Sequence, residues 1–273
     1  MSTRQALLAV LMTANVFAAE PLFQAIQKAD NAAVKRLLDG GASPNAKDAE
    51  GTPALMTAAL FGGADSVKLL LDRGADPNVA NAVGATPLMW AIPNFAKVKL
   101  LVEHGADPKL ATAVGITPLM AAACLDYYEG ETPGPLTGVS EAERLEAVKL
   151  AVELGNDLNA KTHLGDYPLV GTSESMLAHY PDNFDDLANL GTGDARWDGF
   201  TALHGAVLCN QPSILQYLLA KGADPTIKSR LGWTPYTLTQ GIFMANSKKE
   251  FPVAAQILKK AMAEKGQIVA SRE

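Results

Sequence analysis

The sequence has no cluster of basic residues, and this absence excludes several classes of function. Its 23 Lys and Arg residues are outnumbered by 29 Asp and Glu residues, which gives a formal net charge of −6. A protein that binds a nucleic-acid phosphate backbone or an anionic membrane surface needs a concentrated patch of positive charge. We therefore expect no nucleic-acid partner. Hydrophobic residues make up 48% of the chain, enough to build a folded core.

Long hydrophobic runs are also missing, apart from one at the N-terminus that is too short to cross a membrane. The opening MSTRQALLAVLMTANVFAAE has Arg4, an apolar run, and then Val16 and Ala18 at the spacing of a cleavage signal. This pattern predicts a signal peptide over residues 1–18 and export of the protein. The alternative is a cytoplasmic protein in which residues 1–20 fold as an N-terminal cap. No later stretch approaches the roughly 18 apolar residues of a membrane span.

Motifs for catalysis and for cofactor attachment are absent as well. The sequence has no GxSxG, HExxH, P-loop or CxxCH motif. Neither His163 nor His179 has a neighbour at the spacing of a metal ligand. Paired carboxylates such as Asp185 and Asp186 are typical of a solvated surface. We therefore expect no enzymatic activity, no cofactor and no metal site.

The chain does contain an internal repeat of about 33 residues. Each unit has a second apolar pattern with i, i+3, i+4 spacing, which places a hydrophobic stripe on a short helix that only a neighbouring repeat can bury. A glycine then ends that second helix in the left-handed conformation. The units begin with GTPALMTAA at Gly51, GATPLMWAI at Gly84, GITPLMAAA at Gly115, GFTALHGAV at Gly199 and GWTPYTLTQ at Gly232.

These segments resemble the ankyrin repeat, in which a GxTPLHxAA helix, a turn, a VxxLL helix and a β-hairpin loop follow one another. The resemblance implies an all-α ankyrin-repeat solenoid of six to seven helix-turn-helix units joined by β-hairpin loops, over residues 19–264, with a C-terminal tail at 265–273. It also implies that His204, in TALH, makes structural hydrogen bonds between repeats. His104 lies in the last turn of a second helix, where an imidazole suits the helix dipole.

Several units depart from the period. Gly115 to Gly165 spans 50 residues instead of 33, which predicts an insertion at about 125–141. Ser140 and Glu143 then have the spacing of a capping box for the following helix. Residues 165–198 keep a 34-residue period but lose the alanine pair and the VxxLL pattern, so we expect a degenerate, distorted repeat there. The last unit has extra residues between its helices, in GIFMANSKKEFP.

The two cysteines fall at nearly equivalent places, near the ends of the first helices of the fourth and sixth units. With one repeat between them, the roughly 10 Å spacing of packed helices places Cys124 and Cys209 about 20 Å apart, which a disulfide cannot span. We therefore expect two free thiols that fill small spaces in the core. An intermolecular disulfide is the alternative.

Ankyrin proteins bind ligands through the hairpin tips and the exposed side of the first helices, so the resemblance implies a protein-binding surface there. Apolar and aromatic side chains dominate these positions, as a protein interface requires. Two interpretations stay open for the residues after the tip glycines, Ile116, Phe200 and Trp233: ligand contact, or packing against neighbouring hairpins. The candidate binding residues are Phe61, Val83, Trp90, Val114, Leu125, His163, Leu164, Trp197 and Leu231, with Tyr127 and Tyr128 in the insertion.

For the two tyrosines, Tyr127 and Tyr128, the choice between ligand contact, a structural loop and disorder also stays open.

Taken together, these features predict a monomeric, non-enzymatic protein–protein interaction module whose partner the sequence does not identify. The GADP segments, the signal-like start and the ending GWTPYTLTQGIFMANSKKEFPVAAQILKKAM are similar to exported bacterial ankyrin-repeat proteins. That similarity implies a periplasmic or secreted location. The alternative is a cytosolic regulatory or assembly scaffold.

Overall fold

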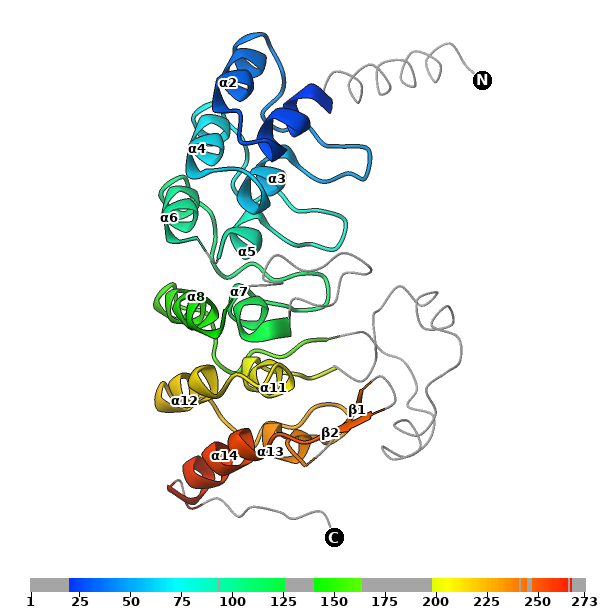
Figure 1. Cartoon of the computed structure of the whole chain (residues 1–273), viewed down its shortest axis with the longest axis vertical. Helices are drawn as coiled ribbons and strands as arrows, with labels where there is room; N and C mark the ends of the chain where they lie inside the picture. Colours follow the sequence, from blue (N-terminus) through cyan, green and yellow to red (C-terminus); the bar gives the residue numbers. More distant parts are fainter. Residues whose placement is uncertain are drawn as a thin grey trace, which may run out of the picture. The chain divides into compact units, whose positions relative to one another are not determined.

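The computed structural model describes residues 20–92, 94–125, 140–163, 198–240, 242–244, 247–264 and 266. The chain divides into two compact units, Met1–Thr112 and Ala113–Glu273. In each unit the described residues form successive pairs of a short first helix and a second helix (Figure 1). This is the predicted all-α repeat fold. Among the described helices, none is long and apolar enough to cross a membrane.

The N-terminal unit contains three described helix pairs. Its second helices pack against one another in order, and the first helices of the second and third pairs pack against each other. Each helix of these pairs has at least one apolar side chain that is almost wholly buried, for example Leu55 and Val67 in the second pair. Full burial of such a side chain contributes about 1.5–3 kcal/mol. The pairs are residues 20–27 with α2 (Asn31–Asp39), α3 (Ala54–Leu60) with α4 (Ala64–Asp72), and α5 (Pro87–Ala91) with α6 (Phe95–Glu103).

The C-terminal unit also contains three described pairs. The last helix, α14, buries Ala254, Leu258 and Met262 at helical spacing and leaves its lysines exposed, as the terminal helix of a repeat array should. The extra residues of the last unit include an antiparallel pair of strands, β1 (Ile242–Met244) and β2 (Ser247–Lys249). The pairs are α7 (Pro118–Met120) and η1 (Ala121–Leu125) with α8 (Glu141–Glu153), α11 (Ala202–Leu208) with α12 (Pro212–Ala220), and α13 (Pro235–Leu238) with α14 (Pro252–Glu264).

The predicted capping box at the start of α8 is confirmed. The Ser140 side chain accepts a hydrogen bond from the Glu143 backbone N–H (3.3 Å), and the Glu143 carboxylate accepts one from the Ser140 backbone N–H (3.0 Å). Hydrogen bonds from the Ser140 side chain and backbone lower the pKa of Glu143. The helix therefore starts where the sequence predicts, while most of the insertion predicted at 125–141 lies outside the described residues, as do residues 1–19 and most of the C-terminal tail.

Asparagine side chains connect the loops of successive repeats in the N-terminal unit. The Asn45 carbonyl oxygen accepts a hydrogen bond from the backbone N–H of Asp76 (2.8 Å), and Asn78 makes the same bond with Asp107 (2.7 Å). Each asparagine also donates to the carbonyl of the glycine two residues before that aspartate. This bond identifies two loops that belong to adjacent repeats.

The same bond shows which repeats are adjacent in the C-terminal unit. Asn159, after α8, accepts from the backbone N–H of Asp224 (2.9 Å), after α12. The helices agree, because η1 packs against α11 and α8 packs against α12. The Glu141 side chain also accepts from the backbone N–H of Ser213 (2.8 Å). The expectation that one repeat separates these two helix pairs was wrong.

Hairpins in this fold have a two-residue tip. In the first one, the Asp48 N–H donates to the Thr52 carbonyl (3.0 Å), and the Gly51 N–H donates back to the Asp48 carbonyl (3.1 Å). The Asp48 side chain accepts a further bond from the Thr52 N–H (2.7 Å). Gly51 has φ +84°, a left-handed conformation that glycine adopts without strain.

The hairpin after α8 has the same bonds across a much longer connection. The Thr162 N–H donates to the Phe200 carbonyl (2.9 Å), the Gly199 N–H donates to the Thr162 carbonyl (3.0 Å), and the Thr162 side chain accepts from the Phe200 N–H (2.9 Å). Residues 163–198 thus occupy the place of a two-residue tip. Apart from Asp198, the degenerate repeat predicted at 165–198 lies outside the described residues, but it does not separate the flanking repeats.

Candidate binding surface

The N-terminal unit exposes two of the predicted binding residues and partly exposes a third. Phe61 follows the last residue of α3 and is 58% exposed, and Val83 lies at a hairpin tip and is 38% exposed. Asn81 holds that tip, because its side chain accepts from the Val83 N–H (3.1 Å). Trp90 of α5 is half-buried and packs against the buried residue Met89 and its neighbours. These side chains are available for contact with a partner.

One exposed aromatic residue was missed by the sequence analysis. Phe95, the first residue of α6, is 67% exposed. In the same helical turn, Lys97 is buried and its ammonium group donates to the carbonyl of Ala59 in α3 (2.8 Å), while burial lowers the pKa of Lys97. The start of α6 therefore adjoins the end of α3, where Phe61 follows. The turn before Phe95 is shorter than in other repeats, so the position of Phe95 cannot be aligned with theirs. The local sequence therefore does not distinguish an exposed aromatic residue from a core aromatic residue here.

In the C-terminal unit, two predicted tip residues meet. The backbone N–H of His163 donates to the carbonyl of Val114 (2.8 Å), so adjacent hairpins are joined edge to edge. The His163 side chain is exposed and Val114 is partly exposed. A third predicted residue, Leu231, is partly exposed and follows Arg230, whose N–H donates to the carbonyl of Asp198 (2.9 Å).

Asp198 marks the point where the long connection re-enters the hairpin. Its side chain is almost fully buried and lies 3.3 Å from a guanidinium nitrogen of Arg230 and 4.0 Å from Nδ1 of His163. A buried carboxylate needs such partners. The ion pair with Arg230 therefore anchors the hairpin at Asp198.

Leu125 is not available for binding, contrary to prediction. It is 1% exposed. The reason is Gly205 of α11: a Cβ atom at this position would lie 2.8 Å from Cγ of Leu125 and 2.5 Å from the Ala123 carbonyl oxygen. Because glycine has no side chain, α11 can approach η1 closely enough to cover Leu125. The other predicted binding residues, Tyr127, Tyr128, Leu164 and Trp197, lie outside the described residues.

The residues after the tip glycines pack inside the fold. Ile116, Phe200 and Trp233 are all buried. The ring of Phe200 stacks on the imidazole of His204, with centroids 4.6 Å apart, and meets Trp233 edge to face at 6.4 Å. Of the two interpretations that the sequence left open, packing against a neighbouring hairpin is confirmed for Phe200 and Trp233, and Ile116 is buried.

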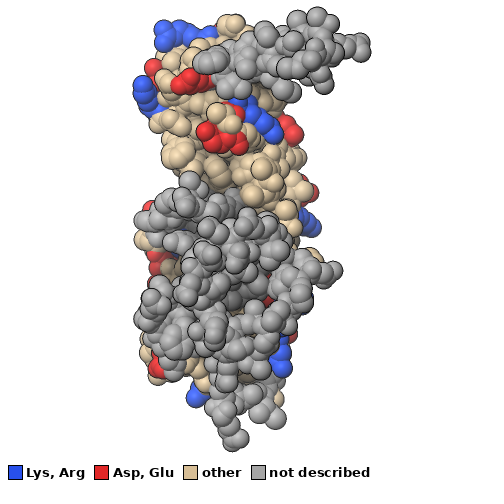
Figure 2. All heavy atoms as spheres, turned by 90° about the vertical axis from the view of Figure 1, so that its right-hand side faces the viewer, with Lys and Arg blue, Asp and Glu red and all other residues tan. Residues whose placement is uncertain are grey.

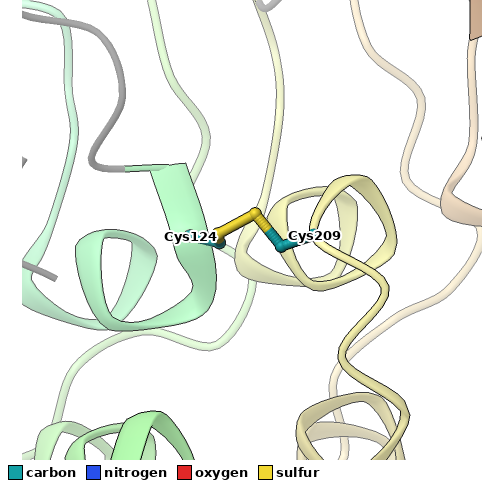
Figure 3. Close-up of a disulfide and its surroundings, with 2 residues drawn as sticks. All are labelled: Cys124 and Cys209. Atoms are coloured by element: carbon teal, nitrogen blue, oxygen red, sulfur yellow. A yellow bond between two sulfur atoms is a disulfide. The ribbon is translucent and has the colours of Figure 1, made fainter. Parts of the chain in front are cut away.

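The cysteines form a disulfide, so the expectation of two free thiols was wrong. Cys124 in η1 and Cys209 at the C-terminal end of α11 face each other (Figure 3), with their Cα atoms 6.3 Å apart. The predicted separation assumed a repeat between them, and the direct packing of η1 on α11 removes it. Cys124 has φ +83°, a left-handed conformation that is uncommon for residues other than glycine.

His204 has the predicted structural role. It is fully buried, its Nδ1 accepts from the backbone N–H of Thr201 (3.1 Å), and its Nε2 therefore carries the hydrogen and donates to the Trp233 carbonyl (3.1 Å). Burial lowers the pKa of His204 to about 4. His104 also behaves as predicted: it ends α6, and its Nδ1 lies 2.8 Å from the carbonyl oxygen of Leu100 in the last turn.

The lowered pKa of His204 predicts a loss of stability in mild acid. The folded state holds the neutral imidazole, whereas the unfolded chain protonates near pH 6.5. Stability is therefore fully present above pH 6.5 and is lost as the pH falls from 6.5 towards 4. Between pH 7.5 and pH 5, urea unfolding of the wild type should lose about 2 kcal/mol more than that of H204Q, which cannot titrate. An equal loss of unfolding free energy in the wild type and in H204Q would contradict the assignment of a neutral, buried His204.

The tips of the N-terminal unit differ in charge. The first hairpin carries Lys47, Asp48 and Glu50, whereas residues 79–86 of the second hairpin include no charged side chain. Figure 2 shows the side towards which the loops of Figure 1 extend, and most of the described surface of this unit there is uncharged. Among the described residues, no group of three or more His, Cys, Asp or Glu side chains could hold a metal ion.

Comparison with known families agrees with the stacked helix pairs and hairpins. A family model described as "Ankyrin repeats (3 copies)" matches residues 22–112, and one described as "Ankyrin repeats (many copies)" matches residues 187–238. The chain is an ankyrin-repeat protein. Ankyrin repeats are protein–protein interaction modules, and the family is generally non-enzymatic. The exposed tip and first-helix side chains therefore form a candidate protein-binding surface.

A human protein, tRNA endonuclease ANKZF1, is 35% identical to this chain over 103 residues. The similarity covers 36% of this chain and 13% of the human protein. The chain thus matches only a small part of that larger protein.

Proposed function

We propose that this ankyrin-repeat protein is exported to the bacterial periplasm or beyond and binds a protein partner there through its hairpin tips and first-helix surface. The main support for binding is the position of its exposed apolar side chains. Among the described residues the large exposed hydrophobics are Phe61, Val83, Phe95 and Val253. Two of these lie at predicted ligand-binding positions, and exposed aromatic residues are common energetic anchors of interfaces.

The support for export comes from two independent features. Residues 1–18 have the pattern of a secretory signal. The Cys124–Cys209 disulfide is partly exposed, and such bonds persist in oxidising compartments but are rare in the cytosol. N-terminal sequencing of the protein from its native host tests this part. A mature protein that starts at Ala19 is the expected result, whereas an intact Met1 would favour the cytosolic scaffold.

Substitution of the exposed tip and helix residues tests the binding surface. A partner is first captured from periplasmic extract with the wild-type protein and identified by mass spectrometry, and its affinity is then measured with purified proteins. We expect F61S/V83S to weaken binding by about thirtyfold or more, since the loss of even one interface anchor costs about 2 kcal/mol. The variant should keep its circular dichroism spectrum and melting temperature, because both side chains are exposed.

The matched control for this experiment is V253S. Val253 is also a large exposed hydrophobic residue, at 53%, but it belongs to α14, a second helix, and so is neither at a hairpin tip nor on a first helix. Its replacement should leave the affinity unchanged. If F61S/V83S binds as tightly as V253S, the proposed surface is wrong, whatever the location of the protein.

A further inference from the structure

One junction between repeats is held together differently from the others. Within the N-terminal unit, adjacent repeats are joined through a two-residue hairpin tip, as between Asp48 and Gly51. Between Thr162 and Gly199 the same hairpin is interrupted by the 36 residues from 163 to 198. Closing a longer connection costs more conformational entropy, so the chain connection at this junction does less to hold the next repeat docked than a two-residue tip does.

The disulfide supplies a second, shorter covalent link at this junction. Cys124 ends the first helix on one side of the junction and Cys209 ends the first helix on the other (Figure 3). Their Cα atoms are 6.3 Å apart. The bond therefore joins the two repeats whose hairpin connection is interrupted, and a residue pair of this kind is found nowhere else among the described residues.

The disulfide is also placed where it can be opened. Cys209 is exposed and Cys124 is partly exposed, and exposed disulfides are more labile towards reduction than buried structural ones. Cys124 has φ +83°, and a left-handed backbone at a residue other than glycine persists only where the surrounding structure enforces it. Opening the bond removes one of these constraints.

We propose that Cys124–Cys209 is a redox-sensitive latch that holds the C-terminal repeats, residues 198–264, docked on the repeat that contains α7, η1 and α8. A dithiol reductant opens it: the S–S bond accepts two electrons and two protons and becomes two thiols, while the reductant is oxidised to its own disulfide. The C-terminal repeats then undock more often while residues 163–198 keep them tethered. Undocking exposes the apolar interface between η1 and α11, including Leu125.

Hydrogen exchange of the full-length protein with and without dithiothreitol tests the latch. Addition of dithiothreitol should speed exchange of the α11 amides (Ala202–Leu208) by tens of fold and leave those of α3 (Ala54–Leu60), in the other unit, unchanged. The C124S/C209S variant should exchange at the reduced rate in both conditions. Equal protection of α11 in oxidised and reduced wild type would overturn the proposal, and this comparison needs no variant to fold.

A shortened connection separates a latch from a disulfide that merely adds stability. In this variant residues 164–197 are deleted, so that His163 and Asp198 form a two-residue tip and restore a short link. If the disulfide substitutes for that link, dithiothreitol should change α11 exchange in the shortened protein by only a few fold. An undiminished response there would show that tether length is irrelevant and would overturn the proposal. Both outcomes are independent of partner binding and of export.

Discussion

The C124S/C209S variant is expected to unfold its C-terminal unit with a free energy about 2.5 kcal/mol lower than that of the oxidised wild type, in line with the tens-of-fold faster exchange expected on reduction. The two cysteines are separated by 85 residues, and a cross-link that closes so long a loop removes much conformational entropy from the unfolded chain. The measurement is a urea titration read by pulse-labelling hydrogen exchange, which reports α11 and α3 separately.

The N-terminal unit provides an internal control for this experiment. It contains no cysteine, so the urea midpoint for α3 should stay where it is in the wild type. If the midpoint for α11 is also unchanged in C124S/C209S, the disulfide contributes no stability and the chain-entropy argument fails for this protein.

The G205A substitution is expected to destabilise the C-terminal unit by about 3 kcal/mol or more. A Cβ atom would lie 2.5 Å from the carbonyl oxygen of Ala123, well inside van der Waals contact. Because this neighbour is backbone, a side-chain rotation cannot relieve the clash, so η1 and α11 must move apart and lose packing. Urea unfolding measures the loss. A titration of free thiols should also show incomplete formation of the Cys124–Cys209 bond.

G63A is the matched control for G205A. Gly63 precedes α4, has an ordinary extended backbone, and a Cβ atom there meets nothing within 4 Å. The alanine should cost less than about 1 kcal/mol, the range of an unfavourable helix N-cap. If G205A is as mild as G63A, the close approach of α11 to η1 is not required for the fold.

Local patterns were sufficient to predict the helices, their buried stripes and several caps. Val67, Leu70 and Leu71 are buried as the i, i+3, i+4 spacing requires, and the Ser140 capping box forms at the predicted place. His204 could be assigned a structural role because its position within the repeat determines its neighbours. These features depend on residues within one repeat or on the next repeat along the chain.

The order in which the repeats pack could not be predicted from the period alone. Residues 165–198 match the period of the array, but the bonds of Thr162 with Gly199 and Phe200 show that the chain leaves and rejoins a single hairpin. The missing VxxLL pattern was the available signal. The wrong order produced the wrong separation of Cys124 and Cys209.

The predicted exposure was correct for some candidate binding residues and wrong for others. The wrong prediction also arose from not knowing which repeats are adjacent. Phe61 and Val83 are exposed as expected, whereas Leu125 is covered by α11 because Gly205 lacks a side chain. Whether a residue at the end of a first helix is exposed depends on the size of a residue in the next repeat in space. That neighbour can be identified only when the order of repeats is known.

The interrupted hairpin also makes the scaffold suitable for protein engineering. Its closing bonds at Thr162 and Gly199 match those of the short hairpin at Asp48 and Gly51, so hairpin closure does not depend on what joins the two sides. A foreign peptide or small domain whose ends lie close together could replace the tip between Asp48 and Gly51 and leave the hairpin bonds in place. The array would then display that guest on the side where its hairpins lie.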